Sequence, residues 1–187
     1  MSQPALESLL LEHSVLTGSF VLASGKTSDV YVDVRRTALR GDGALAIGEA
    51  FLQLLDSQAP TAVAVGGLTL GADPLVTGTS IAASLADREI AAVIVRKDTK
   101  DHGTAKLVEQ PREPRQGDEL VAVDDVVTSA GSTIRAILAL REAGYTVNHA
   151  FCVVDREAGG REALSNIDVT LHALFTLDEL VAKKRAG

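Results

Sequence analysis

The chain has 187 residues, of which 46% are hydrophobic and 3% aromatic, and its formal net charge is −7 at pH 7. This length fits one domain, or one domain with a small annex, and the negative charge argues against a nucleic-acid-binding surface. No apolar run reaches the ~20 residues that a membrane span needs, and the start lacks a basic secretory signal, so we expect a cytoplasmic protein.

Hydrophobic periodicity predicts two regions in chain order. Residues 1–40 should form an N-terminal hood, with a helix at 4–16 and two strands, 19–25 and 29–36, joined by the tight turn "SGKTSD". Residues 41–187 should form an α/β core. Its expected strands are 61–65, 90–97, 119–125, 146–155 and 169–175, and its expected helices are 43–57, 75–87, 132–143, a short one after residue 155, and 177–185. This alternation predicts an open, mainly parallel sheet flanked by helices.

Four polar or glycine-rich segments follow strands of the predicted sheet. They are "GGLTLGADP", "RKDTKDHG", "DDVVTSAGST" and "DREAGGRE". Because the carboxyl ends of parallel strands meet at one edge, we expect these segments to converge there and to form the ligand site.

The segment "VAVDDVVTSAGST" joins a strand to a helix through a polar turn. Backbone N–H groups and hydroxyls in such a turn can cradle a phosphate, and the carboxylates of Asp124 and Asp125 can accept hydrogen bonds from sugar hydroxyls or hold Mg²⁺. Adjacent strand residues point to opposite faces, so both acids can address one ligand only if the strand has ended. The alternative is an acidic cap on an ordinary helix.

The polar segment 98–118 and the residues just before it form a basic region in an acidic protein. Three of the six lysines, Lys97, Lys100 and Lys106, fall within ten residues, together with Arg96 and His102. Such a patch suits a polyanionic ligand, and a connection this long is often a lid. The alternative is a solvated surface loop.

The motifs together resemble those of a known family. "VAVDDVVTSAGST" closely resembles the phosphoribosyl-diphosphate motif of type I phosphoribosyltransferases. "FVLASGKTSDVYVDVR", "VRKDTKDHG" and "DREAGG" resemble the N-terminal signature, the mobile catalytic loop and a substrate-contacting turn of the orotate phosphoribosyltransferase family. The resemblance covers the chain roughly from Phe20 to Gly160, with the four motifs in the expected order.

The resemblance implies a glycosyltransferase of pyrimidine biosynthesis that uses Mg²⁺. It would join orotate to 5-phospho-α-D-ribosyl 1-diphosphate, giving orotidine 5′-phosphate and diphosphate. By similarity, the catalytic residues are Lys100, His102 and Asp125, and orotate contacts Lys26, Thr128 and Arg156. The residues implied to bind phosphoribosyl diphosphate are Arg96, Lys97, Lys100, His102, Asp124, Asp125, Val126, Val127, Thr128, Ser129, Ala130, Gly131, Ser132 and Thr133.

The resemblance also implies a metal arrangement and an assembly. The diphosphate would hold most of the Mg²⁺, with help from Asp124 and Asp125 and without a dedicated protein cage. The protein would be a homodimer with shared active sites, in which the loop of Lys100 and His102 reaches into the partner's site.

The sequence leaves two other functions open. The chain could transfer phosphoribosyl to another base, or it could be a non-catalytic regulator that senses phosphoribosyl diphosphate. A regulator would need a second interaction surface, which an acidic chain of this length does not suggest.

The segment "GGLTLGADP" departs from the family pattern, because it lacks the lysine that many family members carry in this loop. Its glycine N–H groups could face the diphosphate instead, or the segment could be a plain tight turn.

Overall fold

A mainly parallel sheet forms the centre of the molecule. The structure is a computed structural model that describes residues 3–21, 25, 27–98 and 107–186. Within these residues the six-stranded sheet has the order β5 (Val108–Glu109), β4 (Ala91–Val95), β3 (Ala64–Leu68), β6 (Glu119–Val127), β7 (Thr146–Asp155) and β8 (Thr170–Thr176). Every neighbouring pair is parallel except β4 and β5, which confirms the predicted sheet class.

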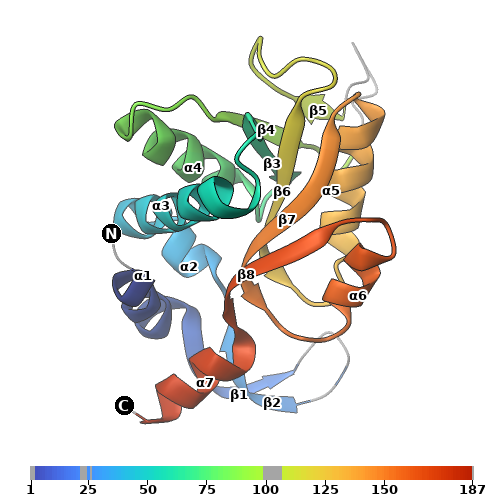
Figure 1. Ribbon diagram of the computed structural model, residues 1–187. Helices are drawn as coiled ribbons and strands as arrows, with labels where there is room; N and C mark the ends of the chain where they lie inside the picture. Colours follow the sequence, from blue (N-terminus) through green and yellow to red (C-terminus); the bar gives the residue numbers. More distant parts are fainter. Residues whose placement is uncertain (1–2, 22–24, 26, 99–106, 187) are drawn as a thin grey trace.

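Helices cover both faces of the sheet, as Figure 1 shows. Helices α3 (Gly41–Gln58) and α4 (Asp73–Leu85) cover one face, and α5 (Gly131–Glu142) and α6 (Gly160–Ser165) cover the other. The first core is centred on Phe51, Leu75 and Phe151, and the second is centred on Ile137 and Leu140. Sheet residues of both cores are fully buried, so the strands between the helices are apolar on both faces.

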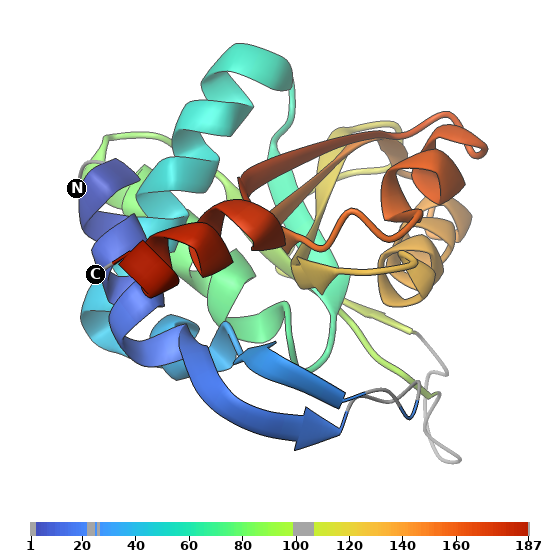
Figure 2. The same cartoon turned by 90° about the horizontal axis from the view of Figure 1, so that it is seen from below.

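The hood contains both ends of the described chain. It begins with α1 (Gln3–Leu9), a π-helical turn η1 (Leu10–Ser14), the hairpin β1 (Val15–Val21) and β2 (Thr27–Val32), and the short helix α2 (Arg35–Ala38). The last helix, α7 (Leu177–Ala186), lies beside it (Figure 2). Lys183 pairs with Glu7, and Lys184 Nζ donates to the carbonyl oxygen of Leu11 at 2.6 Å. The C-terminal helix therefore completes the hood.

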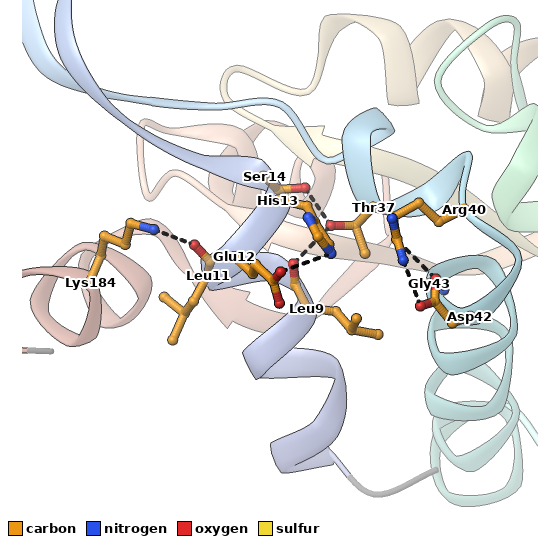
Figure 3. A network of polar contacts seen from close by, with 10 residues as sticks. All are labelled: Leu9, Leu11, Glu12, His13, Ser14, Thr37, Arg40, Asp42, Gly43 and Lys184. Atoms are coloured by element: carbon orange, nitrogen blue, oxygen red, sulfur yellow. Dashed lines mark hydrogen bonds and ion pairs between the residues drawn. The ribbon is translucent and has the colours of Figure 1, made fainter.

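A buried polar contact within the hood lies beside the first helix of the core. The hydroxyls of Ser14 and Thr37 lie 2.7 Å apart, and Thr37 also donates to the carbonyl oxygen of Leu9 at 3.3 Å (Figure 3). Gly43, in the first turn of α3, packs directly on the backbone of Thr37, where a Cβ would lie 2.1 Å from the carbonyl oxygen. The hydrogen bonds therefore join α2 to the chain that precedes β1, and the absence of a side chain on Gly43 lets α2 pack against α3.

Three predicted boundaries in the hood are wrong. The helix predicted at 4–16 ends at Leu9, the π-helical turn follows it, and β1 begins at Val15 rather than at residue 19. The spacing of the apolar residues in this stretch fits both a helix and a strand, which is a common ambiguity of short apolar runs. The strand predicted at 29–36 ends at Val32, where the Asp33 carboxylate accepts a hydrogen bond from the backbone N–H of Arg35 at 3.2 Å and α2 begins.

Two core boundaries also differ from the prediction. The strand predicted at 61–65 is β3 at 64–68, so Gly66 and Gly67 belong to the strand and not to the following loop. A Cβ on Gly67 would lie 2.3 Å from the carbonyl oxygen of Val123 in β6, so this strand position accepts only glycine. The segment 98–118 includes the short edge strand β5. The other core elements agree with their predicted ranges to within about two residues, and none of the described helices combines the length and hydropathy that spanning a bilayer requires.

Replacing Gly48 with alanine should destabilise the fold. A Cβ on Gly48 would lie 2.2 Å from the carbonyl oxygen of Gly78, where α3 and α4 cross at backbone contact. The methyl group must push the helices apart, which we expect to lower the free energy of unfolding by about 1–3 kcal/mol in urea denaturation. Gly41→Ala is the matched control, since a Cβ there meets nothing within 4 Å and alanine favours the helix. Equal stabilities of the two variants would contradict the proposed close crossing.

Candidate active site

The loops after β3, β6 and β7 lie at the carboxyl edge of the sheet, as the sequence predicts, whereas residues 99–106 of the loop after β4 lie outside the described residues. Two of them are joined directly, because the backbone N–H of Arg156 donates to the carbonyl oxygen of Val127 at 2.8 Å. The β3 loop lies against β6 as well, since a Cβ on Gly71 would be 2.9 Å from Oδ1 of Asp125. The β3 loop therefore lies beside Asp125, and the segment after β7 lies beside the end of β6.

Asp124 is buried, with 6% of its surface exposed, and it faces α5. Its Oδ2 accepts hydrogen bonds from Ser132 Oγ and Thr133 Oγ1, both at 2.7 Å, and its Oδ1 accepts one from the backbone N–H of Asp125 at 3.0 Å. These bonds satisfy both oxygens and stabilise a negative charge beside the N-terminus of a helix. As the structure stands, Asp124 braces the start of α5.

Asp125 faces the opposite side of the sheet. It lies beside Gly71 and within electrostatic reach of Arg35, and its Oδ1 accepts a hydrogen bond from the backbone N–H of Val126 at 2.8 Å. Burial, and then the charge of Asp124, raise the pKa of Asp125 to about 6. The strand end predicted at residue 125 is wrong: β6 continues to Val127, so the acid pair follows the strand alternation.

The turn between β6 and α5 presents its backbone to solvent. Ala130 has a left-handed conformation, with φ 61°, and its carbonyl oxygen accepts the N–H of Ile134 at 2.8 Å. The residues exposed around it are Thr128, Ser129, Gly131 and Ser132, whereas Val127 and Ala130 are buried. A left-handed residue that leads into a helix N-terminus forms a concave set of N–H groups, which suits a phosphate.

The predicted cationic residues have different surroundings. Arg96 pairs with Glu109 at 3.0 Å between Nη1 and Oε1, and the exposed Lys97 accepts a hydrogen bond at its carbonyl oxygen from Arg135. Arg156 is half-buried directly after β7. The predicted residues Lys26, Lys100 and His102 lie outside the described residues.

Sequence reasoning missed Arg35 as a residue of this site. Asp33 binds its guanidinium at two points, with Nε–Oδ1 at 2.8 Å and Nη2–Oδ2 at 3.1 Å. This pair raises the pKa of Arg35, and the charge of Asp125 raises it further. The sequence alone does not show that Arg35 differs in its surroundings from its neighbour Arg36, because the difference arises only when the chain folds.

Comparisons with known proteins agree with the fold and the motifs. No family model matches the chain. The orotate phosphoribosyltransferase of Thermosynechococcus vestitus is 42% identical over 177 residues, which cover 95% of this chain and 92% of that protein. Among solved structures, the orotate phosphoribosyltransferase of Mycobacterium tuberculosis in complex with Fe(III) dicitrate has a TM-score of 0.83 at 33% identity and covers 95% of this chain and 98% of its own. The structure of that enzyme in complex with 5-phospho-α-D-ribosyl 1-diphosphate has a TM-score of 0.79 at 30% identity. The alignment covers 96% of this chain and 98% of that chain.

Asp125→Asn should stabilise the protein at pH 8. The carboxyl of Asp125 has a pKa of about 6 in the folded protein, whereas an unperturbed aspartate titrates near ~3.9. The folded state therefore binds this proton more tightly, so ionised Asp125 destabilises the fold above pH 6, and the penalty shrinks as the pH falls through 6. An amide avoids the buried charge, so thermal unfolding with a chelator present should give the variant a higher Tm at pH 8 and a smaller gain at pH 5.

Asp178→Asn is a suitable control for this experiment, because Asp178 is exposed in the first turn of α7. It should show no gain that depends on pH. An Asp125→Asn variant with the same Tm as the parent protein at both pH values would show that the carboxyl of Asp125 is not destabilised by burial.

Proposed function

Because the chain belongs to the orotate phosphoribosyltransferase family, we propose that it transfers the 5-phosphoribosyl group of 5-phospho-α-D-ribosyl 1-diphosphate to orotate, giving orotidine 5′-phosphate and diphosphate. The observation that carries this proposal is the turn from Thr128 to Thr133, which offers a phosphate cradle directly after the acid pair. Transfer to another base, or sensing without catalysis, is less well supported, since relatives that align with nearly the whole chain are named for orotate.

We infer that Asp125 at the end of β6 and the turn that follows β6 bind opposite ends of the sugar phosphate. The 5-phosphate would take the exposed N–H groups and hydroxyls of the turn. Asp125, on the side of the hood and the β3 loop, would accept hydrogen bonds from the ribose hydroxyls. Asp124 would contribute mainly by holding Ser132 and Thr133 in place, because both of its oxygens already accept hydrogen bonds.

Orotate would bind between the turn after β7 and the hood. The guanidinium of Arg156 suits the planar carboxylate that distinguishes orotate from uracil. Thr128 comes from the neighbouring turn, which the hydrogen bond between Arg156 and Val127 ties to the turn after β7. The part assigned to Lys26 rests on the sequence resemblance alone.

The reaction exchanges one bond at C1 of the ribose for another. The bond from C1 to the diphosphate oxygen breaks and its electron pair leaves with the diphosphate. C1 bonds to a ring nitrogen of orotate, and the proton of that nitrogen passes to the departing diphosphate or to water. Positive charge develops on the ribose and negative charge on the leaving group, so cationic side chains near the diphosphate lower the barrier. Arg96, Lys97, Lys100 and His102 are the proposed cations, and the proposal requires no nucleophile from the protein.

The described residues suit a Mg²⁺ ion that is bound chiefly by the substrate. They include no group of three or more His, Cys, Asp or Glu side chains that could hold a metal. Hard carboxylate oxygens that hold an ion directly or through water are typical where substrate phosphates supply the other ligands. Asp125 is the acid that could help here, and bound Mg²⁺ would supply positive charge to the departing diphosphate.

We also propose a homodimer with shared active sites that works in the cytoplasm. The sequence resemblance supports the dimer. The cytoplasmic location is supported by the substrates, because phosphorylated sugars do not cross a bilayer unaided.

An absorbance assay of orotate consumption tests the proposed function. Purified protein with 5-phospho-α-D-ribosyl 1-diphosphate and Mg²⁺ should consume orotate, and parallel reactions with uracil, hypoxanthine and adenine should show no comparable turnover, since only orotate carries the carboxylate for Arg156. Consumption of another base instead of orotate would favour a different transferase. Binding of the sugar diphosphate without turnover of any base would favour a regulator.

Mixing two inactive variants tests the shared active site. Lys100→Ala should lose about 10²–10³ in turnover as a charge-stabilising group is removed, and Asp125→Asn should be badly impaired. If the loop serves the partner's site, a mixed dimer has one site with both defects and one intact site. Random pairing makes half of the dimers mixed, so activity should return to about a quarter of the parent value. Proven subunit exchange without any return of activity would show that the loop acts within its own subunit.

A further inference from the structure

Arg156 lies between two peptide groups that are each held by a hydrogen bond. Its own backbone N–H donates to the carbonyl oxygen of Val127 at 2.8 Å, and the backbone N–H of Glu157 donates to Oδ1 of Asp155 at 2.8 Å. The second bond closes a turn in which a side-chain carboxylate takes the place of a backbone carbonyl. Glu157 has a left-handed backbone, with φ 52°, which is unfavourable for a residue with a side chain. The backbone of Arg156 is therefore fixed on both sides, and one of the two bonds comes from the Asp155 side chain.

The carboxylate of Asp155 is itself held in place. Its side chain is 2% exposed, and its Oδ2 accepts a hydrogen bond from Nη2 of Arg161 at 3.0 Å. Nη1 of Arg161 donates to the carbonyl oxygen of Leu171 in β8 at 2.6 Å, so this guanidinium connects the turn to the neighbouring strand. A buried carboxylate needs partners at its oxygens, and here one partner is Arg161 and the other is the backbone directly after Arg156.

The turn that carries Arg156 also packs on the turn between β6 and α5. A Cβ on Gly160, which begins α6, would lie 2.7 Å from the carbonyl oxygen of Thr128 and 2.4 Å from Cγ1 of Val127. The hydrogen bond between Arg156 and Val127 joins the same two turns. Orotate and the 5-phosphate are proposed to bind on these turns, so the spacing between their sites depends on how the turn after β7 is held.

The two arginines of this turn have different surroundings. The guanidinium of Arg161 is bonded to Asp155 and Leu171. Among the described residues, no ion pair involves the guanidinium of Arg156, which is half-buried directly after β7. Arg156 is thus available for the carboxylate of a ligand, whereas Arg161 belongs to the support of the turn.

We propose that Asp155 is a positioning residue for Arg156 and thereby helps to set the affinity for orotate. Contact between a guanidinium and a planar carboxylate depends on direction as well as charge, so it weakens when the backbone that carries the arginine shifts. This inference rests on the proposed function, because it concerns the residue that is assigned to the carboxylate of orotate.

Steady-state kinetics of Asp155→Ala tests this positioning role. In a variant whose folding is verified by thermal unfolding, kcat/KM for orotate should fall about 10- to 100-fold, mainly through KM, because a misplaced binding group costs about this much. The KM for phosphoribosyl diphosphate should stay within about threefold. Asp155→Asn keeps an oxygen for the N–H of Glu157 and should recover part of the loss. Glu162→Gln, which alters an exposed acid on α6, is the matched control and should behave as the parent does.

Combining Asp155→Ala with Arg156→Ala separates positioning from general damage. If Asp155 acts through Arg156, the substitution of Asp155 in the Arg156→Ala background should lower kcat/KM for orotate by no more than about a further twofold. A merely structural loss would have the same size in both backgrounds. If Asp155→Ala does not fold, Arg161→Ala takes its place, because the Arg161 side chain is 58% exposed. It should raise the KM for orotate in the parent background and leave it unchanged in the Arg156→Ala background.

The outcomes distinguish this inference from the proposed function. A parent protein that consumes no orotate would overturn the proposed function itself. An active parent whose KM for orotate is unchanged by Arg156→Ala would overturn the assignment of Arg156, and the positioning role with it. Folded Asp155→Ala and Arg161→Ala variants with the orotate kinetics of the parent, or with equal losses in the presence and absence of Arg156, would overturn only the positioning role of Asp155.

Discussion

The hydrogen bonds from Ser132 and Thr133 to the buried carboxylate of Asp124 are the contact on which the site depends. They fasten the first turn of α5 to the end of β6, and so fix the left-handed turn at Ala130 between them. A buried carboxylate is costly unless its oxygens are satisfied, and here the two bonds from Ser132 and Thr133 also hold the turn that is proposed to bind a phosphate. Asp125 faces the opposite side, so the two adjacent acids have different surroundings.

The parts of the candidate site whose residues lie close together in the sequence could be predicted from the sequence alone. The acids, the hydroxyl residues and the glycine between Val121 and Thr133 predicted a strand, a turn and a helix, because each signal lies within a few residues of the next. The parallel sheet followed from the same alternation, and with it the meeting of four loops at one edge. The strand end at Asp125 was misjudged, since β6 runs on through two further residues beside β7.

The remaining features depend on contacts between distant segments. Gly66 and Gly67 look like loop residues, but β3 accepts them because β6 and α5 approach its backbone closely. Helix α2 is too short for a periodic signal, and its position is set by the contact between Thr37 and Ser14. Arg35 could not be distinguished from other surface arginines, because its relation to Asp125 exists only when the hood is in place.

The contacts of α7 with η1 and β2 in the hood have a consequence for how the protein is made. Lys184 bonds to the backbone of Leu11, 173 positions earlier, and Arg185 pairs with Asp29 of β2. A ribosome synthesises the chain from its N-terminus, so the α/β core can form while the hood still lacks its last helix. The hood is completed only after α7 has left the exit tunnel. A nascent chain would therefore form the turn between β6 and α5 before α7 completes the hood.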